Sequence, residues 1–172
     1  MRRFLLGFII GVILLPLFAF SYIYFGYAPV ATAAPPFPLE RKITSMALNA
    51  RISKEAPKDA AIPVNEDNLM AGAKVYREQC EICHGASGPE SPTAQGMFPH
   101  PPQLLHGKGV TDDPPGETYW KVKNGIRLTG MPAYGPSLPD QQIWQVSVFL
   151  ANADKLPGPV SAYLSKPAET SR

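Results

Sequence analysis

The stretch GAKVYREQCEICH, residues 72–84, decides how this chain folds and what it binds. It contains the two cysteines of the sequence, Cys80 and Cys83, separated by two residues and followed at once by His84. Thioether attachment of haem needs two thiols close together, one for each vinyl group. A histidine directly after the second thiol can then reach the iron. The motif therefore predicts one covalent haem c on Cys80 and Cys83, with His84 as an axial ligand.

Other uses of a C-x-x-C pair stay open at this point. A redox dithiol is expected beside a βαβ unit, whereas residues 69–76 favour a helix with no strand before it. A structural zinc site needs four ligands. His84, His100 and His106 are available, but there is no second C-x-x-C.

The second axial ligand is predicted to be Met131, which follows His84 by 47 residues, enough chain to wrap around a haem. Gly130 lets the backbone approach closely, and Pro132 fixes the chain direction after the methionine. The site is thus expected to consist of Cys80, Cys83, His84 and Met131, with iron bound by the last two.

Four alternatives to Met131 remain. Met97 is the chief rival, although a methionine beside Phe98 and Pro99 more often packs against a ring than ligates a metal. His100 and His106 are most simply loop residues, and an open sixth position is the fourth possibility. Met70 stands too near the attachment motif to reach the opposite haem face.

The N-terminus carries a run of 24 uncharged residues, Phe4 to Tyr27. At about 1.5 Å per residue such a helix spans a hydrocarbon core of roughly 30 Å. Arg2 and Arg3 keep the N-terminus in the cytoplasm, so the rest of the chain is expected on the periplasmic side of the inner membrane. A cleaved signal is the competing interpretation, because Ala31-Thr32-Ala33 fits a cleavage site.

Composition bounds the remaining possibilities. The chain of 172 residues has 20 prolines and a formal charge of +2, too mild to indicate nucleic-acid binding.

We predict an anchor or signal over 1–33, a Pro-rich periplasmic linker over 34–65, a haem domain over 66–156 and a C-terminal tail over 157–172. Within the linker, 41–54 suits a short helix on the membrane, on the next domain or in solvent.

Helical patterns flank the proposed ligand loop. A helix is expected from Pro114-Pro115 to Asn124-Gly125, because proline suits a helix start and glycine a helix end. A second is expected over 139–150, with Asp140 as its cap and apolar residues on one face.

With both halves of the site identified, the sequence resembles the class I c-type cytochromes with one haem. The resemblance rests on the pattern Gly72-x-x-x-Tyr76-x-x-x-C-x-x-C-H, on Gly130-Met131-Pro132 and on the helix 139–150, and it covers about 66–153. It implies an all-α cytochrome c fold behind a single transmembrane helix. In that fold the N- and C-terminal helices cross, with Gly72 allowing close approach and Tyr76 and Trp144 nearby.

A haem with His and Met ligands has no place for a substrate and suits one-electron transfer. We therefore expect a respiratory electron carrier rather than an enzyme, with redox proteins as partners and no small-molecule substrate. Lys121, Lys123 and Arg127 are candidate docking charges, or simply a solvated helix face. The alternatives are a subunit of an oxidase or dehydrogenase complex and, third, a haem peroxidase or sensor with an open site.

Overall fold

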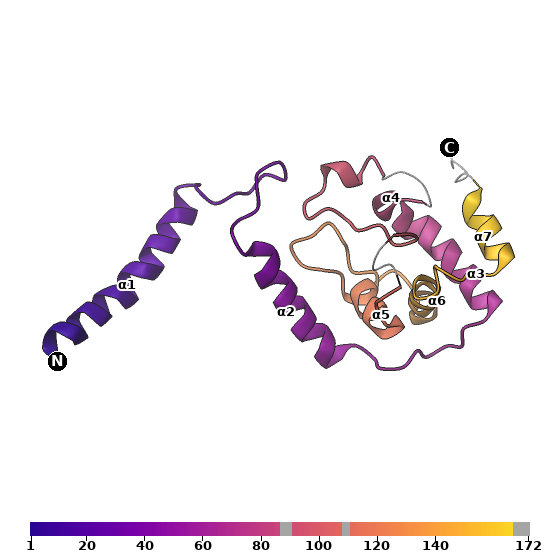
Figure 1. Ribbon diagram of the computed structural model, residues 1–172, viewed down its shortest axis with the longest axis horizontal. Helices are drawn as coiled ribbons and strands as arrows, with labels where there is room; N and C mark the ends of the chain where they lie inside the picture. The colour runs from indigo at the N-terminus through magenta and orange to yellow at the C-terminus, as the bar shows by residue number, and fades with distance from the viewer. Residues whose placement is uncertain (87–90, 108–110, 167–172) are drawn as a thin grey trace. The chain divides into compact units, whose positions relative to one another are not determined.

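The computed structural model describes residues 1–86, 91–107 and 111–166 (Figure 1). Its regular elements in these ranges are helices, and no strand occurs among them. The chain divides into two compact units, Met1–Ile43 and Thr44–Arg172. The predicted all-α class is confirmed.

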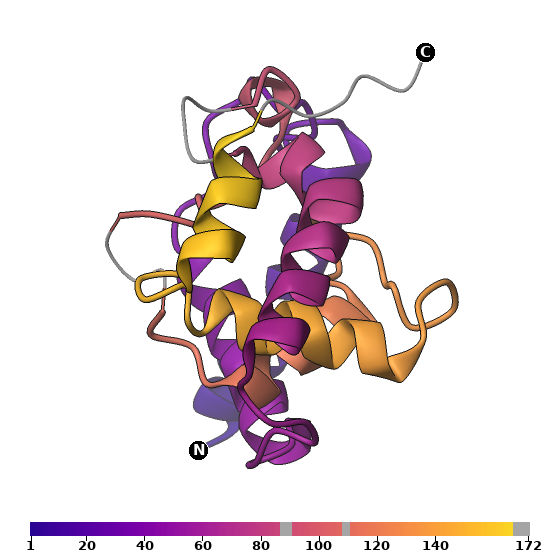
Figure 2. The ribbon, with the colours of Figure 1, turned by 90° about the vertical axis from the view of Figure 1, so that its right-hand side faces the viewer.

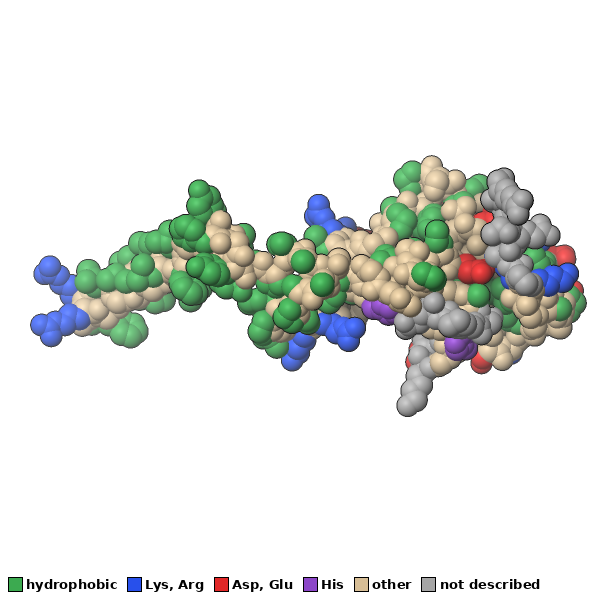
Figure 3. Space-filling model, turned by 90° about the horizontal axis from the view of Figure 1, so that it is seen from above, with side chains coloured by type: hydrophobic (Ala, Val, Ile, Leu, Met, Phe, Trp, Pro, Cys, Tyr) green, Lys and Arg blue, Asp and Glu red, His purple; other side chains and the backbone are tan. Residues whose placement is uncertain are grey.

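In the first unit, α1 (Arg2–Tyr24) is an apolar helix with Pro16 inside it and no buried residue. Within the described ranges it is the one helix long and apolar enough to cross a membrane. Hydrophobic side chains cover the α1 surface that Figure 3 shows, and Lys and Arg side chains stand at its N-terminal end. This agrees with the predicted apolar helix and its two leading arginines.

The next helix, α2 (Glu40–Glu55), runs into the second unit, and its C-terminal half packs there. Ile52 is only 2% exposed, and the Glu55 carboxylate accepts a 3.0 Å hydrogen bond from the indole N–H of Trp120. A Cβ on Gly116 would collide with the carbonyl oxygen of Pro57. Of the three places left open for this helix, the structure places its C-terminal end on the helices that follow it in the second unit.

The core of the second unit is the crossing of α3 (Glu66–Val75) and α6 (Asp140–Leu150), which Figure 2 shows in projection. Asn65 is the N-cap of α3, and its side chain accepts a 2.9 Å hydrogen bond from the backbone N–H of Asn68. Gly72 is buried where the helices meet, and a Cβ there would lie 2.6 Å from the Cβ of Phe149. The implied close approach at Gly72 is confirmed.

Helix α5 (Pro115–Asn124) packs against α6 as its neighbour. The rings of Tyr119 and Trp144 stack with their centroids 4.2 Å apart. The helix has the predicted bounds and ends at Gly125, whose φ of +67° favours glycine. Trp144 therefore packs on α5, while Tyr76 of the attachment region packs on Phe149 with ring centroids 5.8 Å apart.

The start of α6 differs from the expected cap. Pro139 occupies the N-cap position, and the structure gives no side-chain capping bond there. The Asp140 carboxylate instead accepts a 2.9 Å hydrogen bond from Lys123 of α5. A charged partner within reach takes the carboxylate away from the backbone N–H groups.

One helix was not anticipated. Residues treated as a tail contain α7 (Gly158–Ser165), which packs beside α3 and buries Val160 and Leu164 (Figure 2). Arg77 holds its end, because the guanidinium donates to the carbonyls of Leu164, at 2.9 Å, and of Lys166.

Candidate functional site

The C-x-x-C-H segment lies where the α3 helix ends. The chain passes from α3 through the π-turn η1 (Tyr76–Cys80) into α4 (Glu81–His84) and stops at Gly85, whose φ is +79°. Extra residues in a helical turn are frequent at functional sites. Cys80, Cys83 and His84 all line a single cavity.

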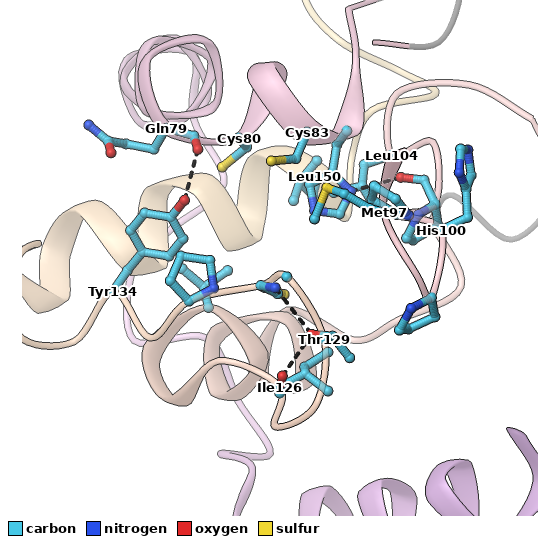
Figure 4. Close-up of a pocket in the computed structure, with 18 residues that line it drawn as sticks. Gln79, Cys80, Cys83, Met97, His100, Leu104, Ile126, Thr129, Tyr134 and Leu150 are labelled. Carbon is cyan, nitrogen blue, oxygen red and sulfur yellow. Dashed lines mark hydrogen bonds between the residues drawn. The ribbon is translucent and has the colours of Figure 1, made fainter. Parts of the chain in front are cut away.

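The cavity has a volume of about 160 Å³. Figure 4 shows Cys80 and Cys83 on one side of it, and Ile126 and Thr129 on the other. Its wall is mostly apolar and is formed by Gln79, Cys80, Cys83, His84, Met97, Pro99, His100, Pro101, Pro102, Leu104, Val122, Ile126, Thr129, Gly130, Met131, Pro132, Tyr134 and Leu150. Such a lining suits an apolar ligand with a few polar groups.

His84 is oriented by a backbone carbonyl. Its Nδ1 lies 2.8 Å from the oxygen of Pro102, which can only accept, so Nδ1 carries the proton. Burial lowers the pKa of His84, against a smaller opposing effect of that hydrogen bond. The neutral ring therefore leaves the lone pair of Nε2 available to a metal.

The thiol chemistry argues against a redox dithiol. Burial, and to a smaller degree the neighbouring Cys83, raises the pKa of the Cys80 thiol to about 12. Reactive dithiols have lowered pKa values because the thiolate is the nucleophile. The described residues also bring together no group of three or more His, Cys, Asp or Glu side chains that suits a metal ion. His106 is exposed and does not line the cavity.

Met131 lines the cavity from the loop between α5 and α6. This loop is closed by its own hydrogen bonds. The Thr129 hydroxyl donates to the carbonyl of Ile126 at 2.7 Å and accepts from the N–H of Met131 at 3.1 Å. The N–H of Ile126 donates to the carbonyl of Met131 at 3.2 Å. The role of Thr129 in this turn was not predicted from the sequence. The available signal was a hydroxyl side chain directly before Gly130.

Two tyrosine hydroxyls bracket the attachment segment, and sequence reasoning assigned a bond to neither. Tyr76 donates to the carbonyl of Gly85 at 2.6 Å, and Tyr134 donates to the carbonyl of Gln79 at 2.8 Å. Both bonds join residues far enough apart in sequence that no local pattern indicates them. Burial raises the pKa of Tyr76 above its usual value, so the hydroxyl stays protonated.

Two of the rival ligand residues also lie at the cavity. Met97 and His100 both line it, from the loop after η2 (Ala94–Gly96). The Met97 side chain lies directly against Gly130, because a Cβ on Gly130 would collide with the terminal methyl group of Met97. The thioethers of Met97 and Met131 thus border one cavity, and Met97 packs on the loop that carries Met131. Part of the preceding loop, 87–90, and residues 108–110 lie outside the described residues.

Two of the three candidate docking charges are engaged within the domain. Lys121 pairs with Asp113, and Lys123 pairs with Asp140 while its ammonium group donates to the hydroxyl of Tyr119 at 2.8 Å. Arg127 is exposed.

Residues 67–150 match the family described as cytochrome C oxidase, cbb3-type, subunit III. No curated protein matches the chain. A solved chain of a reducing HAO-like protein complex from Kuenenia stuttgartiensis is 24% identical with a TM-score of 0.46, over 55% of this chain and 48% of that one. This chain thus spans about half the length of that relative. Residues 67–150 are thus similar to a c-type cytochrome domain.

Proposed function

We propose that the protein is a membrane-tethered electron carrier with one haem c, attached at Cys80 and Cys83 and ligated by His84 and Met131. The single observation that carries this proposal is that these four residues, from two separate segments, line one largely apolar cavity. The family match supports covalent haem and electron transfer.

The residues fit this group chemically. Two thiols with a two-residue gap suit the vinyl groups, a neutral imidazole suits iron, and a thioether is the second ligand typical of electron carriers. When bound, haem c supplies a one-electron couple between Fe(III) and Fe(II). Ligation by His and Met raises the reduction potential and leaves no position for a substrate.

The remaining contributions are those of the protein. The Pro102 carbonyl orients His84 and fixes its tautomer. The hydroxyl of Thr129 holds the turn around Met131. Apolar side chains, including Val122, Ile126 and Leu150, exclude water from the cavity and so favour the less charged state of a bound iron centre.

The tether and its orientation are part of the proposal. Helix α1 is long enough to span the membrane, and Arg2 and Arg3 at its start favour a cytoplasmic N-terminus. The haem domain would then face the periplasm, where redox proteins of the respiratory chain are its partners. Protease treatment of spheroplasts tests this: the haem domain should be digested from outside, and protection of the domain would contradict the orientation.

A subunit of a larger oxidase complex is the second candidate, favoured by the description of the matching family as an oxidase subunit. Gentle solubilisation and purification on a C-terminal tag distinguishes the two. A free carrier should be recovered alone, whereas a subunit should bring other haem or copper proteins in fixed ratio.

The ligation is tested by the visible spectrum of the haem-loaded protein, oxidised and reduced, with and without carbon monoxide. We expect a weak far-red band in the oxidised form and no ready carbon monoxide binding in the reduced form. Met131→Ala should abolish the band and open the site. Met97→Leu is the matched control at the same cavity and should keep both properties. Ready carbon monoxide binding by the unaltered protein would instead favour a peroxidase or sensor.

A further inference from the structure

Tyr134 joins the two sides of the cavity. Its hydroxyl donates a 2.8 Å hydrogen bond to the carbonyl of Gln79, the residue directly before Cys80, and Figure 4 shows this bond at the edge of the cavity. Its backbone N–H donates at 3.0 Å to the carbonyl of Val122 in α5. One residue, three positions after Met131, thus contacts both the attachment segment and α5.

The turn around Met131 depends on such ties for its position. The hydrogen bonds through Thr129 and between Ile126 and Met131 fix the shape of the turn. Both lie within the turn, so they do not fix its position relative to the attachment segment. Behind it, the N–H of Gly135 donates to the carbonyl of Lys123 at 3.0 Å, which ties the chain to α5. The Tyr134 hydroxyl supplies the tie toward the segment that carries Cys80 and His84.

We propose that Tyr134 is a positioning residue, whose hydrogen bond to Gln79 holds the Met131 loop against the attachment segment and so keeps the thioether on the iron. The inference rests on the proposed ligation by His84 and Met131. A thioether is a neutral and weak ligand. The more conformational freedom its loop gains on release, the more the released state is favoured. Breaking one tie of the loop raises the fraction of time that the sixth position is open.

Tyr76 provides a matched comparison. Its hydroxyl also donates to a backbone carbonyl of the attachment segment, that of Gly85, at 2.6 Å. Its ring packs on Phe149 of α6. Replacing either tyrosine by phenylalanine removes the same atom and the same kind of bond. Tyr134→Phe removes one tie of the Met131 loop, whereas Tyr76→Phe removes a bond at Gly85, the other end of the attachment segment.

The experiment uses the full-length, haem-loaded protein in detergent, as wild type, Tyr134→Phe and Tyr76→Phe. The reduced proteins are mixed with carbon monoxide, and the binding rate is recorded together with the midpoint of thermal unfolding. Carbon monoxide binds after Met131 leaves, so its rate reports the open fraction. We expect Tyr134→Phe to bind about fivefold to tenfold faster than wild type, the factor that one hydrogen bond is worth. Tyr76→Phe should stay within about twofold of wild type while its unfolding midpoint falls.

Two results would overturn the role of Tyr134 but leave the proposed ligation standing. In the first, the wild type binds carbon monoxide slowly and Tyr134→Phe binds it at the same rate. In the second, Tyr76→Phe accelerates binding as much as Tyr134→Phe does, which would indicate a general loosening of the domain. If the wild type itself binds carbon monoxide as an open site does, the proposed ligation fails and the role of Tyr134 fails with it. The wild-type rate therefore separates the two failures.

Discussion

Gly72 of α3 lies directly against Phe149 of α6, so that a Cβ on Gly72 would stand 2.6 Å from the Cβ of Phe149 and would collide with the backbone oxygen of Gln145. The neighbouring backbone cannot give way as a flexible side chain could. This contact sets how closely α3 and α6 cross, and α3 leads directly into the segment with Cys80, Cys83 and His84.

Gly72→Ala is therefore expected to destabilise the domain by about 1–3 kcal/mol, the usual cost of overpacking a core. Chemical unfolding followed by circular dichroism measures the change. Gly158→Ala is the matched control, because nothing lies within 4 Å of its Cβ position. The control should stay within about 0.5 kcal/mol. Equal changes in the free energy of unfolding for the two substitutions would show that the helix crossing can accommodate a Cβ at Gly72.

Arg77 is expected to hold α7 on the domain. Its guanidinium donates to the carbonyls of Leu164 and Lys166, lies 4.7 Å from the ring centroid of Tyr163 and pairs with Glu81. Arg77→Met should raise amide hydrogen exchange across α7 and cost about 1–3 kcal/mol, because partly buried polar groups lose their partners.

The control for Arg77 is Arg51→Met. Arg51 also pairs with a glutamate four residues on, Glu55, but their side chains are 66% and 39% exposed. Exposed pairs of this kind contribute about 0.3–0.5 kcal/mol. An unchanged exchange pattern of α7 in Arg77→Met would contradict the role of this arginine.

The C-terminal end of α2 is expected to contribute to the stability of the second unit. Ile52→Ala removes a side chain that is 2% exposed and should cost about 2 kcal/mol or more. It should also expose residues 56–65 to limited proteolysis, since they follow the docked end of α2. Ile43→Ala, on the same helix at 59% exposure, should change stability by less than about 0.5 kcal/mol. A free linker would make both substitutions equally neutral.

The pairing of Lys123 with Asp140 predicts a dependence of stability on pH. The hydrogen bond from Lys123, and then the hydroxyl of Tyr119, lower the pKa of Asp140 below its usual value. A carboxyl group with a lowered folded-state pKa stabilises the fold fully above its unfolded pKa of about 3.9 and loses this contribution as the pH falls through the folded value. The difference between wild type and Asp140→Asn should thus be present at pH 7 and vanish in strong acid. A difference that is constant with pH would contradict the pairing.

Thr129 is expected to hold the turn that contains Met131 through its hydroxyl group. Thr129→Val should speed hydrogen exchange at the amide of Met131 by about fivefold to tenfold, because that N–H loses its acceptor. Thr129→Ser keeps the hydroxyl and should restore slow exchange. Equal exchange in Val and Ser variants would show that the backbone bond between Ile126 and Met131 suffices.

Much of the fold could be predicted because its signals are local. The bounds of α5 follow from Pro115 and Gly125, and the apolar run marks α1. The C-x-x-C-H motif needs no more than covalent spacing to indicate its chemistry. Gly72 could be identified because a resemblance supplied its role. Met131 was named from its place between two helices, and the structure does bring it to the cavity of His84.

What the sequence by itself determined is therefore the set of helices, the attachment motif and the candidate ligands, since each depends on neighbours within a few residues. The tertiary structure alone decided which distant groups meet: Pro102 with His84, Tyr134 with Gln79, Arg77 with the end of α7, and Lys123 with Asp140. In the unfolded chain these groups form hydrogen bonds with water instead, so each pair meets only when packing brings its two partners together. No local pattern selects them, because burial and helix crossing fix the distances between residues far apart in the chain.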